Sequence, residues 1–288
     1  MIFRVMLTRR NFLKSSAAAL PAMALQSGLP KPHQPIGVQL YTVRNLAEKD
    51  LPGVLKQISA IGFQQVETYW NVYTHPAKEL RKMIDDAGLS VPSGHFDYDG
   101  FEGKLDYAKQ LGVNWMVCPM LPQNMQYSWD GFHAAAKKFN EWGKQVASLG
   151  MRFAFHNHDY EFKPYNNGKT GYQVLLEETD PTLVFFEMDC YWITQSGNDP
   201  VEMLHKLGKR VRMIHLKDRK AGFPPSYDME ESSSHFTEVG HGSINWKAVI
   251  DTAQKMGIEY YFVEQDQSPG NPLDSIRASY KYIRTIIA

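Results

Sequence analysis

The chain has 288 residues, 43% of them hydrophobic, so it can bury a large core and lies within the size range of one α/β barrel. Lysine plus arginine and aspartate plus glutamate each number 31, which gives a formal net charge of zero. A balanced charge argues against a nucleic acid or an acidic membrane surface as the partner, and a small neutral or weakly charged ligand fits better.

The N-terminus matches the pattern of a twin-arginine export signal. Arg9 and Arg10 lie in the run TRRNFLK, and the short apolar run 17–25 behind it contains Ala-Met-Ala, which is typical of a cleavage site. The alternative is a chance Arg-Arg pair in a tail. We assign residues 1–34 to a signal peptide and linker, and we expect residues 35–288 to form a periplasmic or otherwise extracytoplasmic protein. The apolar run is shorter than the about 20 residues of a membrane span, and no cysteine marks a lipid-anchoring site, so no membrane anchor is expected in the mature form.

Two cysteines, Cys118 and Cys190, are few for an exported chain. Both fall near predicted strand ends. Buried free thiols are therefore expected rather than a disulfide framework, with a single bridge as the alternative.

Strand-like and helix-like stretches alternate along the rest of the chain. Six amphipathic stretches end at a glycine, and in nearly every case an apolar run follows, which is the pattern of a helix that ends in the left-handed conformation before a strand. These glycines are Gly62, Gly88, Gly112, Gly150, Gly208 and Gly257. We predict strands over 36–42, 64–68, 91–95, 115–120, 152–158, 183–189, 211–216 and 260–264. We predict helices over 51–61, 76–87, 101–111, 129–149, 199–207, 246–256 and 272–287, and a weaker one near 171–178.

Eight strands that alternate with eight helices indicate a (β/α)8 TIM barrel in a single domain. An open doubly wound sheet is the alternative, but no Gly-x-Gly-x-x-Gly run follows the first strand. The longest stretch without a predicted element is 217–244. Its length and its start next to His215 indicate a segment that covers the active site.

Several predicted strands run directly into a histidine or a carboxylate. Asp189, His215 and Glu264 end three successive strands, and His156 or His158 ends the strand before them. In a parallel barrel the carboxyl ends of the strands open onto one face, so these residues are expected to meet there. Carboxylate and imidazole ligands suit a divalent ion such as Mn, Co, Zn or Mg. The alternative is a metal-free active site with hydrogen-bonded polar residues.

The runs around these residues resemble those of the xylose-isomerase-like TIM-barrel sugar isomerase/epimerase family, over about residues 35–288. They are FHNHDYEF from Phe155, EMDCYW from Glu187, IHLKD from Ile214, EVGHG from Glu238 and VEQD from Val263. The resemblance implies a metal held by Glu, Asp, His and Glu at the ends of strands five to eight. It implies Asp189, His215 and Glu264 as ligands, and proton transfer next to a carbonyl or hydroxyl group.

One position departs from the family pattern. His156 stands where many members have a glutamate, so a symmetric epimerisation with two glutamate bases is not expected, and Glu264 is left as the glutamate acid/base. A neutral imidazole also leaves the metal a stronger Lewis acid. We expect proton removal alpha to a ketone, followed by isomerisation or by loss of a β-substituent. The family includes inosose dehydratases and enzymes of 3-keto-glycosides, which together with export implies a keto-sugar or glycoside substrate.

Other residues complete the expected site. Lys217 shares the parity of His215 and is a candidate to stabilise an oxyanion, or else a surface lysine. His158 is a further acid/base candidate. Glu161 is expected to bind hydroxyls or to replace His156 on the metal.

Glu67 and His95 are expected to hold sugar hydroxyls or transfer a proton from the opposite side of the cavity, with satisfied core residues as the alternative. Trp192, Trp70 and Tyr41 are candidates for stacking on a pyranose ring, and core packing is the alternative for each of them.

Two other functions fit the same barrel. An apurinic-type DNA endonuclease needs a basic surface, which the zero net charge does not favour, and the export signal argues against it as well. A non-catalytic carbohydrate-binding barrel would be favoured by loss of Asp189 or Glu264, and both are present. The expected partner is a small carbohydrate, and an oligomer is compatible with the sequence.

Overall fold

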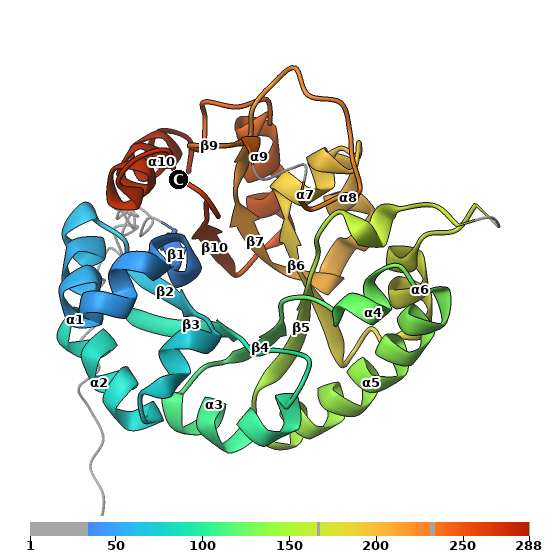
Figure 1. Ribbon diagram of the computed structural model, residues 1–288, viewed down its shortest axis with the longest axis horizontal. Helices are drawn as coiled ribbons and strands as arrows, with labels where there is room; N and C mark the ends of the chain where they lie inside the picture. Colours follow the sequence, from blue (N-terminus) through green and yellow to red (C-terminus); the bar gives the residue numbers. More distant parts are fainter. Residues whose placement is uncertain (1–33, 166–167, 231–233, 288) are drawn as a thin grey trace, which may run out of the picture. The chain divides into compact units, whose positions relative to one another are not determined.

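Eight parallel strands close into a barrel in the computed structural model, which describes residues 34–165, 168–230 and 234–287 (Figure 1). Going round the barrel, the strands follow chain order, and the last strand pairs with the first. The predicted (β/α)8 TIM barrel is therefore confirmed. The strands are β1 (Gly37–Gln39), β2 (Gln65–Thr68), β3 (Ser90–His95), β4 (Trp115–Cys118), β5 (Arg152–His156), β6 (Val184–Asp189), β7 (Val211–Leu216) and β10 (Tyr260–Val263).

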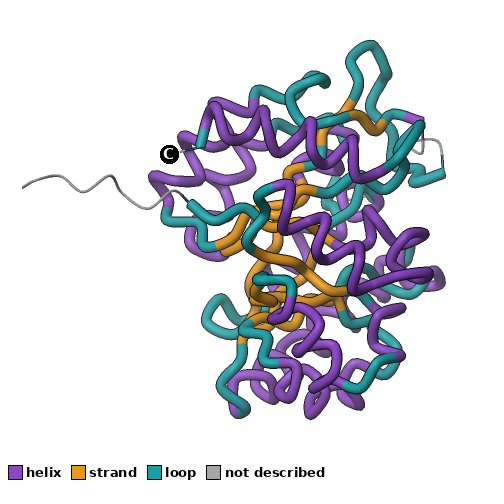
Figure 2. Tube along the Cα trace, turned by 90° about the vertical axis from the view of Figure 1, so that its left-hand side faces the viewer, coloured by secondary structure: helices purple, strands orange, loops and turns teal. Residues whose placement is uncertain are grey.

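Helices surround the barrel on its outside, and Figure 2 shows the strands enclosed between them. The α-helices are α1 (Arg44–Ile61), α2 (Ala77–Asp86), α3 (Leu105–Leu111), α4 (Gln123–Gln126), α5 (Trp129–Ser148), α6 (Gly171–Glu178), α7 (Cys190–Gln195), α8 (Pro200–Leu207), α9 (Trp246–Met256) and α10 (Pro272–Ile286). Short 3-10 helices are η1 (Leu40–Val43), η2 (Trp70–Thr74), η3 (Phe101–Lys104), η4 (Tyr160–Phe162) and η5 (Gly208–Arg210). None of the described helices is both long enough and apolar enough to cross a membrane.

Local sequence signals explain where several helices begin and end. Asp199 caps α8 by accepting hydrogen bonds from the backbone N–H groups of Val201 and Glu202, and Pro200 occupies the first turn. The six predicted junction glycines all have positive φ, and Gly112 and Gly257 cap α3 and α9 in the left-handed region. The repeated βα unit predicted from these glycines is thus present.

The first and fifth strands are shorter than predicted. β1 stops at Gln39 because the Gln39 side chain accepts a hydrogen bond from the N–H of Tyr41 and starts the turn η1. β5 ends at His156, so His158 lies beyond the strand. This places the two histidines of the His-Asn-His run at different heights along the barrel.

The sequence predicted no regular structure over 217–244, and the structure corrects this prediction. The stretch contains an antiparallel hairpin of β8 (Asp218–Arg219) and β9 (Phe236–Thr237). The buried Asp218 carboxylate accepts hydrogen bonds from the Gly240 N–H at 2.9 Å and from the Trp246 indole N–H at 2.7 Å. These bonds fix both ends of the segment next to the barrel.

The hydrophobic core has two main parts. Helix α5 illustrates the outer part, since Phe132, Phe139, Trp142 and Val146 recur at helical spacing and are buried. Inside the barrel, a smaller apolar cluster fills one end: Trp115, Val117, Ala154, Met213 and Phe262. This apolar set forms the floor below the polar residues of the barrel.

Two predictions concern single features. Cys118 and Cys190 are free and buried, as expected. The predicted twin-arginine signal falls on residues that lie outside the described part of the chain, and it remains a prediction.

Candidate metal centre and active site

The period-two alternation of the strands builds the site above the apolar floor. On β7, Met213 belongs to the floor, and His215 and then Lys217 follow at two-residue steps toward the open end. The same order recurs on two other strands and the residues that follow them: Ala154, His156 and His158 from β5, and Phe262, Glu264 and Asp266 from β10. Adjacent strands thus present histidines and carboxylates at the same level.

Three of these residues and Asp189 of β6 converge in what we call the outer cluster, consisting of His156, Asp189, His215 and Glu264. One potential ligand atom of each lies within 4.8 Å of all the others, and all four side chains are buried. His215 Nδ1 is 2.8 Å from Glu264 Oε2 and 3.9 Å from Asp189 Oδ2, and His156 Nε2 is 3.8 Å from the same Asp189 oxygen. The structure therefore brings together the four residues predicted to hold the metal.

The chemistry of the outer cluster fits a divalent ion. Asp189 Oδ2 is buried and accepts no hydrogen bond within the described part of the chain, although Lys217 Nζ lies 3.3 Å away. Burial raises the pKa of Asp189 to about 7, despite the opposing effect of Lys217. Two carboxylate oxygens and two imidazole nitrogens form a ligand set that zinc, manganese or cobalt accepts.

The groups of the outer cluster also interact with one another strongly. Burial opposes the charged form of His215, but the carboxylates of Glu187 and Glu264 outweigh it and raise its pKa well above the usual value. Burial likewise opposes ionisation of Glu264, but Lys217 and His215 hold its pKa well below the usual value. Metal binding would have to displace a proton from His215, so the affinity is expected to depend on pH.

Lys217 is a buried cation and not a surface lysine. Its Nζ lies 2.7 Å from Asp266 Oδ1, 2.9 Å from Glu264 Oε2 and 3.3 Å from Asp189 Oδ2. Burial opposes the charge, but Asp189, Asp266 and Glu264 raise the pKa of Lys217 well above its usual value. Lys217 therefore remains an ammonium group that can donate a hydrogen bond to an anion.

A cavity of about 180 Å³ opens directly over this cluster. Tyr41 and Trp70 form part of its wall, with ring centroids 5.5 Å apart, so both lie where the predicted sugar-stacking role requires. The remaining lining residues are His95, Pro119, Met120, His156, His158, Lys217, Met229, Glu264 and Asp266. A larger groove of about 640 Å³ over Tyr127 and Tyr227 shares Met229 with this cavity.

His158 and Glu161 take different positions although they are three residues apart. His158 lines the cavity, burial lowers its pKa well below the usual value, and its Nδ1 has no hydrogen-bond partner among the described residues. Glu161 is fully buried, and its carboxylate accepts hydrogen bonds from the His158 backbone N–H at 3.0 and 3.2 Å. Burial raises the pKa of Glu161 to about 8. Glu161 therefore supports the His158 backbone, and neither the cavity wall nor the outer cluster contains it.

Two residues predicted to bind substrate lie elsewhere. Trp192 packs against Tyr191 and Phe236 beneath Lys217, whose Nζ lies 5.2 Å from the indole ring, and the described lining of the cavity does not include Trp192. Its aromatic neighbours favour core packing over exposure. Glu67 is fully buried and accepts hydrogen bonds from His215 Nε2 at 2.7 Å and from Gln39 Nε2 at 2.8 Å, so it lies below the cavity.

His95 belongs to both levels. It lines the cavity as predicted, and its Nε2 lies 2.8 Å from Glu187 Oε2 and 3.2 Å from Glu67 Oε2. Burial opposes protonation of His95, but Glu67 and Glu187 raise its pKa to about 10. His95 is therefore an imidazolium held between two carboxylates.

Two acidic residues of the site were missed, although the sequence carried a signal for both. Glu187 lies two residues before Asp189, and Asp266 lies two residues after Glu264, so each shares the inward parity of a predicted ligand. The alternation rule, applied along the full length of each strand, would have found them.

Comparisons with known proteins identify relatives of this chain. Residues 55–286 match the family model described as "Xylose isomerase-like TIM barrel". The chain is 25% identical over 270 residues to an inosose dehydratase of Geobacillus thermodenitrificans, covering 80% of this chain and 87% of that protein. A sugar phosphate isomerase/epimerase of Parabacteroides distasonis superposes with a TM-score of 0.74 at 23% identity, covering 87% of this chain and 98% of that one.

A more distant structure, the IOLI protein with a bound zinc atom, superposes with a TM-score of 0.67 at 13% identity. That match covers 88% of this chain and 98% of the other. At such low identity the two structural likenesses bear on the fold, and the ligand of each neighbour is a property of that neighbour.

Proposed function

Because the chain belongs to the xylose isomerase-like TIM barrel family, we propose that it is a divalent-metal-dependent enzyme of the lyase or isomerase kind that acts on a keto-sugar or a glycoside. The observation that carries the proposal is the outer cluster at the base of the cavity, where Asp189 Oδ2 is buried without a hydrogen bond from the described residues. The inosose dehydratases among its relatives support a sugar-like substrate with a carbonyl group.

The residues that would hold the ion are His156, Asp189, His215 and Glu264. When bound, a divalent ion supplies Lewis acidity toward a substrate oxygen. The fit of the ligand set supports a metal, and its two imidazole nitrogens favour zinc, manganese or cobalt over magnesium.

Residues of the chain itself would stabilise the developing negative charge and transfer the proton. Lys217 is placed to donate a hydrogen bond to a substrate oxygen that gains negative charge, since its ammonium group lines the cavity. His158 and Glu264 are the candidates for moving a proton at the carbon next to the carbonyl. Glu264 already accepts from Lys217 and His215, whereas His158 has an unpartnered ring nitrogen among the described residues, so we place the base role on His158 first.

Elimination is the first candidate reaction. The base removes the proton alpha to the ketone, the electron pair of that C–H bond forms the new double bond, and the β-substituent leaves with its own electron pair and takes up a proton. The groove that shares Met229 with the cavity gives the second unit of a glycoside a place to bind, which favours a glycoside over a free sugar.

Isomerisation or epimerisation is the second candidate. The presence of two potential proton-transfer groups, His158 and Glu264, on the wall of one cavity favours it, because return of the proton to another carbon or face would complete such a reaction.

We also propose that the protein works outside the cytoplasm. The support is the twin-arginine pattern at Arg9 and Arg10. Glycosides and their oxidised forms are substrates that such a location would supply.

The experiment incubates the purified protein in D2O with glycosides, 3-keto-glycosides and free ketoses, and follows each mixture by NMR. Wild type with Mn2+, Co2+ or Zn2+ is compared with protein treated with a chelator. We expect deuterium at the carbon next to the carbonyl, and loss of the aglycone from a 3-keto-glycoside, only in the metal-loaded sample. An isomeric product would move the second candidate ahead of elimination. Binding without deuterium uptake or product would overturn an enzymatic function in favour of carbohydrate binding, and equal turnover in chelator would overturn the metal requirement.

A further inference from the structure

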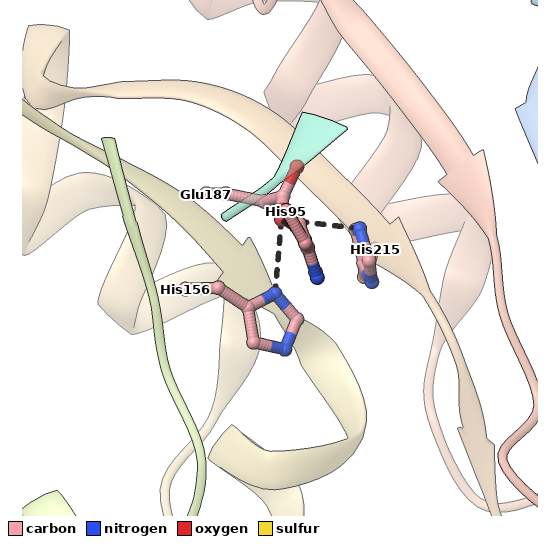
Figure 3. A group of neighbouring side chains, drawn as sticks. All are labelled: His95, His156, Glu187 and His215. Atoms are coloured by element: carbon pink, nitrogen blue, oxygen red, sulfur yellow. Dashed lines mark hydrogen bonds and ion pairs between the residues drawn. The ribbon is translucent and has the colours of Figure 1, made fainter. Parts of the chain in front are cut away.

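A second layer of histidines and carboxylates lies beneath the outer cluster, one inward step deeper in the barrel. Its centre is Glu187, which lies opposite His156 in the β5–β6 register and is fully buried. Figure 3 shows three imidazole rings gathered around this one carboxylate. We call this layer the inner cluster, and it consists of His95, His156, Glu187 and His215.

A single oxygen of Glu187 contacts all three rings. Glu187 Oε2 lies 2.8 Å from His95 Nε2, 3.0 Å from His156 Nδ1 and 3.2 Å from His215 Nε2. The other oxygen, Oε1, has no hydrogen-bond partner within the described part of the chain. An ionised carboxylate can only accept, so each of these ring nitrogens must carry its hydrogen toward Glu187 for the contact to stabilise the fold.

His156 and His215 belong to both clusters, and they use opposite nitrogens for each. His156 presents Nδ1 to Glu187 and Nε2 to Asp189. His215 presents Nε2 to Glu67 and Glu187, and Nδ1 to Glu264 and Asp189. With a hydrogen held on each inner nitrogen, the outer nitrogen can lend its lone pair to an ion, which at His215 means that the ion replaces the proton shared between Nδ1 and Glu264.

A second ion in the inner cluster is the competing interpretation, since the same four residues have suitable spacing. A neutral imidazole has one N–H and one lone pair, so His156 and His215 can serve the inner or the outer position with a lone pair but not both. Binding an ion at both positions would require each ring to lose both of its N–H protons. The 2.8 Å contact of His95 with Glu187 and the 2.7 Å contact of His215 with Glu67 are ordinary hydrogen-bond distances.

We propose that Glu187, assisted by Glu67, is a positioning residue that fixes the tautomers of His156 and His215 and so directs one divalent ion to the outer cluster. This inference rests on the metal site of the proposed function. Carboxylates behind metal-binding histidines orient the ring and raise its basicity, and their loss lowers metal affinity by about 10- to 100-fold in other metal sites.

The test measures metal affinity by chelator competition for wild type, Glu187→Gln and a matched control, Asp218→Asn. Asp218 is also a fully buried carboxylate with hydrogen-bonded N–H donors, but it holds the β8–β9 hairpin and lies in neither cluster. We expect one ion per wild-type chain, a dissociation constant raised about 10- to 100-fold in Glu187→Gln, and a change of less than about twofold in Asp218→Asn.

A second measurement on the wild type keeps the inference testable if Glu187→Gln does not fold. Ring-¹⁵N histidine NMR of the Zn2+-loaded protein should show a hydrogen on His156 Nδ1 and on His215 Nε2, with the opposite nitrogens shifted by the ion. The reversed tautomers, two ions per chain, or an unchanged affinity in a folded Glu187→Gln would each overturn the role of Glu187. A wild type that binds no ion would instead refute the metal site of the proposed function.

Discussion

Replacing Lys217 by methionine removes an ammonium group that contacts three carboxylates at the base of the cavity. Asp266, Glu264 and Asp189 approach Lys217 Nζ at 2.7, 2.9 and 3.3 Å, and the Lys217 side chain is 2% exposed. Removing one partner of a buried ion pair costs about 3–5 kcal/mol, because the remaining charges stay buried without compensation. In a chelator, Lys217→Met should therefore lower Tm by about 6–20 °C for a chain of this size.

The same substitution should increase the effect of metal on stability. Lys217 and a divalent ion are both cations that would share Glu264 and Asp189, so the lysine opposes the ion and its loss removes that repulsion. We expect the Tm increase on adding Zn2+ or Mn2+ to be larger in Lys217→Met than in wild type, while activity falls. Thermal unfolding with and without metal measures both effects.

Lys247→Met is the matched control, because Lys247 Nζ makes a 2.7 Å ion pair with Asp251 at the surface, where the lysine side chain is 71% exposed. An exposed pair contributes about 0–1 kcal/mol, so this variant should unfold close to wild type. The reasoning fails if Lys217→Met unfolds in chelator within about 2 °C of Lys247→Met, because that difference in Tm corresponds to about 1 kcal/mol or less. It also fails if metal stabilises Lys217→Met less than wild type.

Three further predictions address other parts of the chain. Burial raises the pKa of Glu161 to about 8 from an ordinary value of 4.5, so the folded state holds the proton to higher pH than the unfolded state. Wild type should therefore lose up to about 1.4 kcal/mol of stability per pH unit, relative to Glu161→Gln, as pH rises from about 4.5 to about 8. Free energies of urea unfolding that change equally in the two proteins between about pH 5 and pH 8 would contradict this. His156→Glu places a carboxylate next to Glu187 and adds a negative charge at the metal, so it should slow elimination from a 3-keto-glycoside and allow exchange at the neighbouring carbon; NMR rates equal to wild type for both would show that the histidine has no mechanistic role. Arg9→Lys with Arg10→Lys should retain the protein in the cytoplasm, and unchanged secretion of the double mutant in cell fractions would refute the export route.

The barrel could be predicted because its signals are local and repeated. Six junctions between a helix and the next strand contain a glycine that adopts a positive φ, as Gly112 and Gly257 show. The position of the outer cluster along the barrel could be predicted in the same way, because Asp189 and His215 lie near the ends of adjacent strands and are in register. These inferences needed only the chain order and the alternation of side chains.

Packing between distant segments determined what the sequence did not reveal. Trp192 is of a residue type that stacks on sugars, but Phe236 from the β8–β9 hairpin packs against it. That hairpin depends on hydrogen bonds that Asp218 accepts from residues 22 to 28 positions further along the chain. Glu67 lies near the end of β2, where a cavity residue was expected, but its carboxylate accepts a hydrogen bond from His215 of β7. Neither partner can be read from the local run of residues.

The most direct test is the position of the ion in a crystal of the wild type grown with Mn2+ or Zn2+, located by anomalous diffraction. One peak bonded to His156 Nε2, Asp189, His215 Nδ1 and Glu264 is the result that we predict. A peak among His95, Glu187 and the inner nitrogens of His156 and His215 would contradict the placement of the metal at the base of the cavity. No peak at either position in the loaded protein would contradict a metal-dependent function altogether.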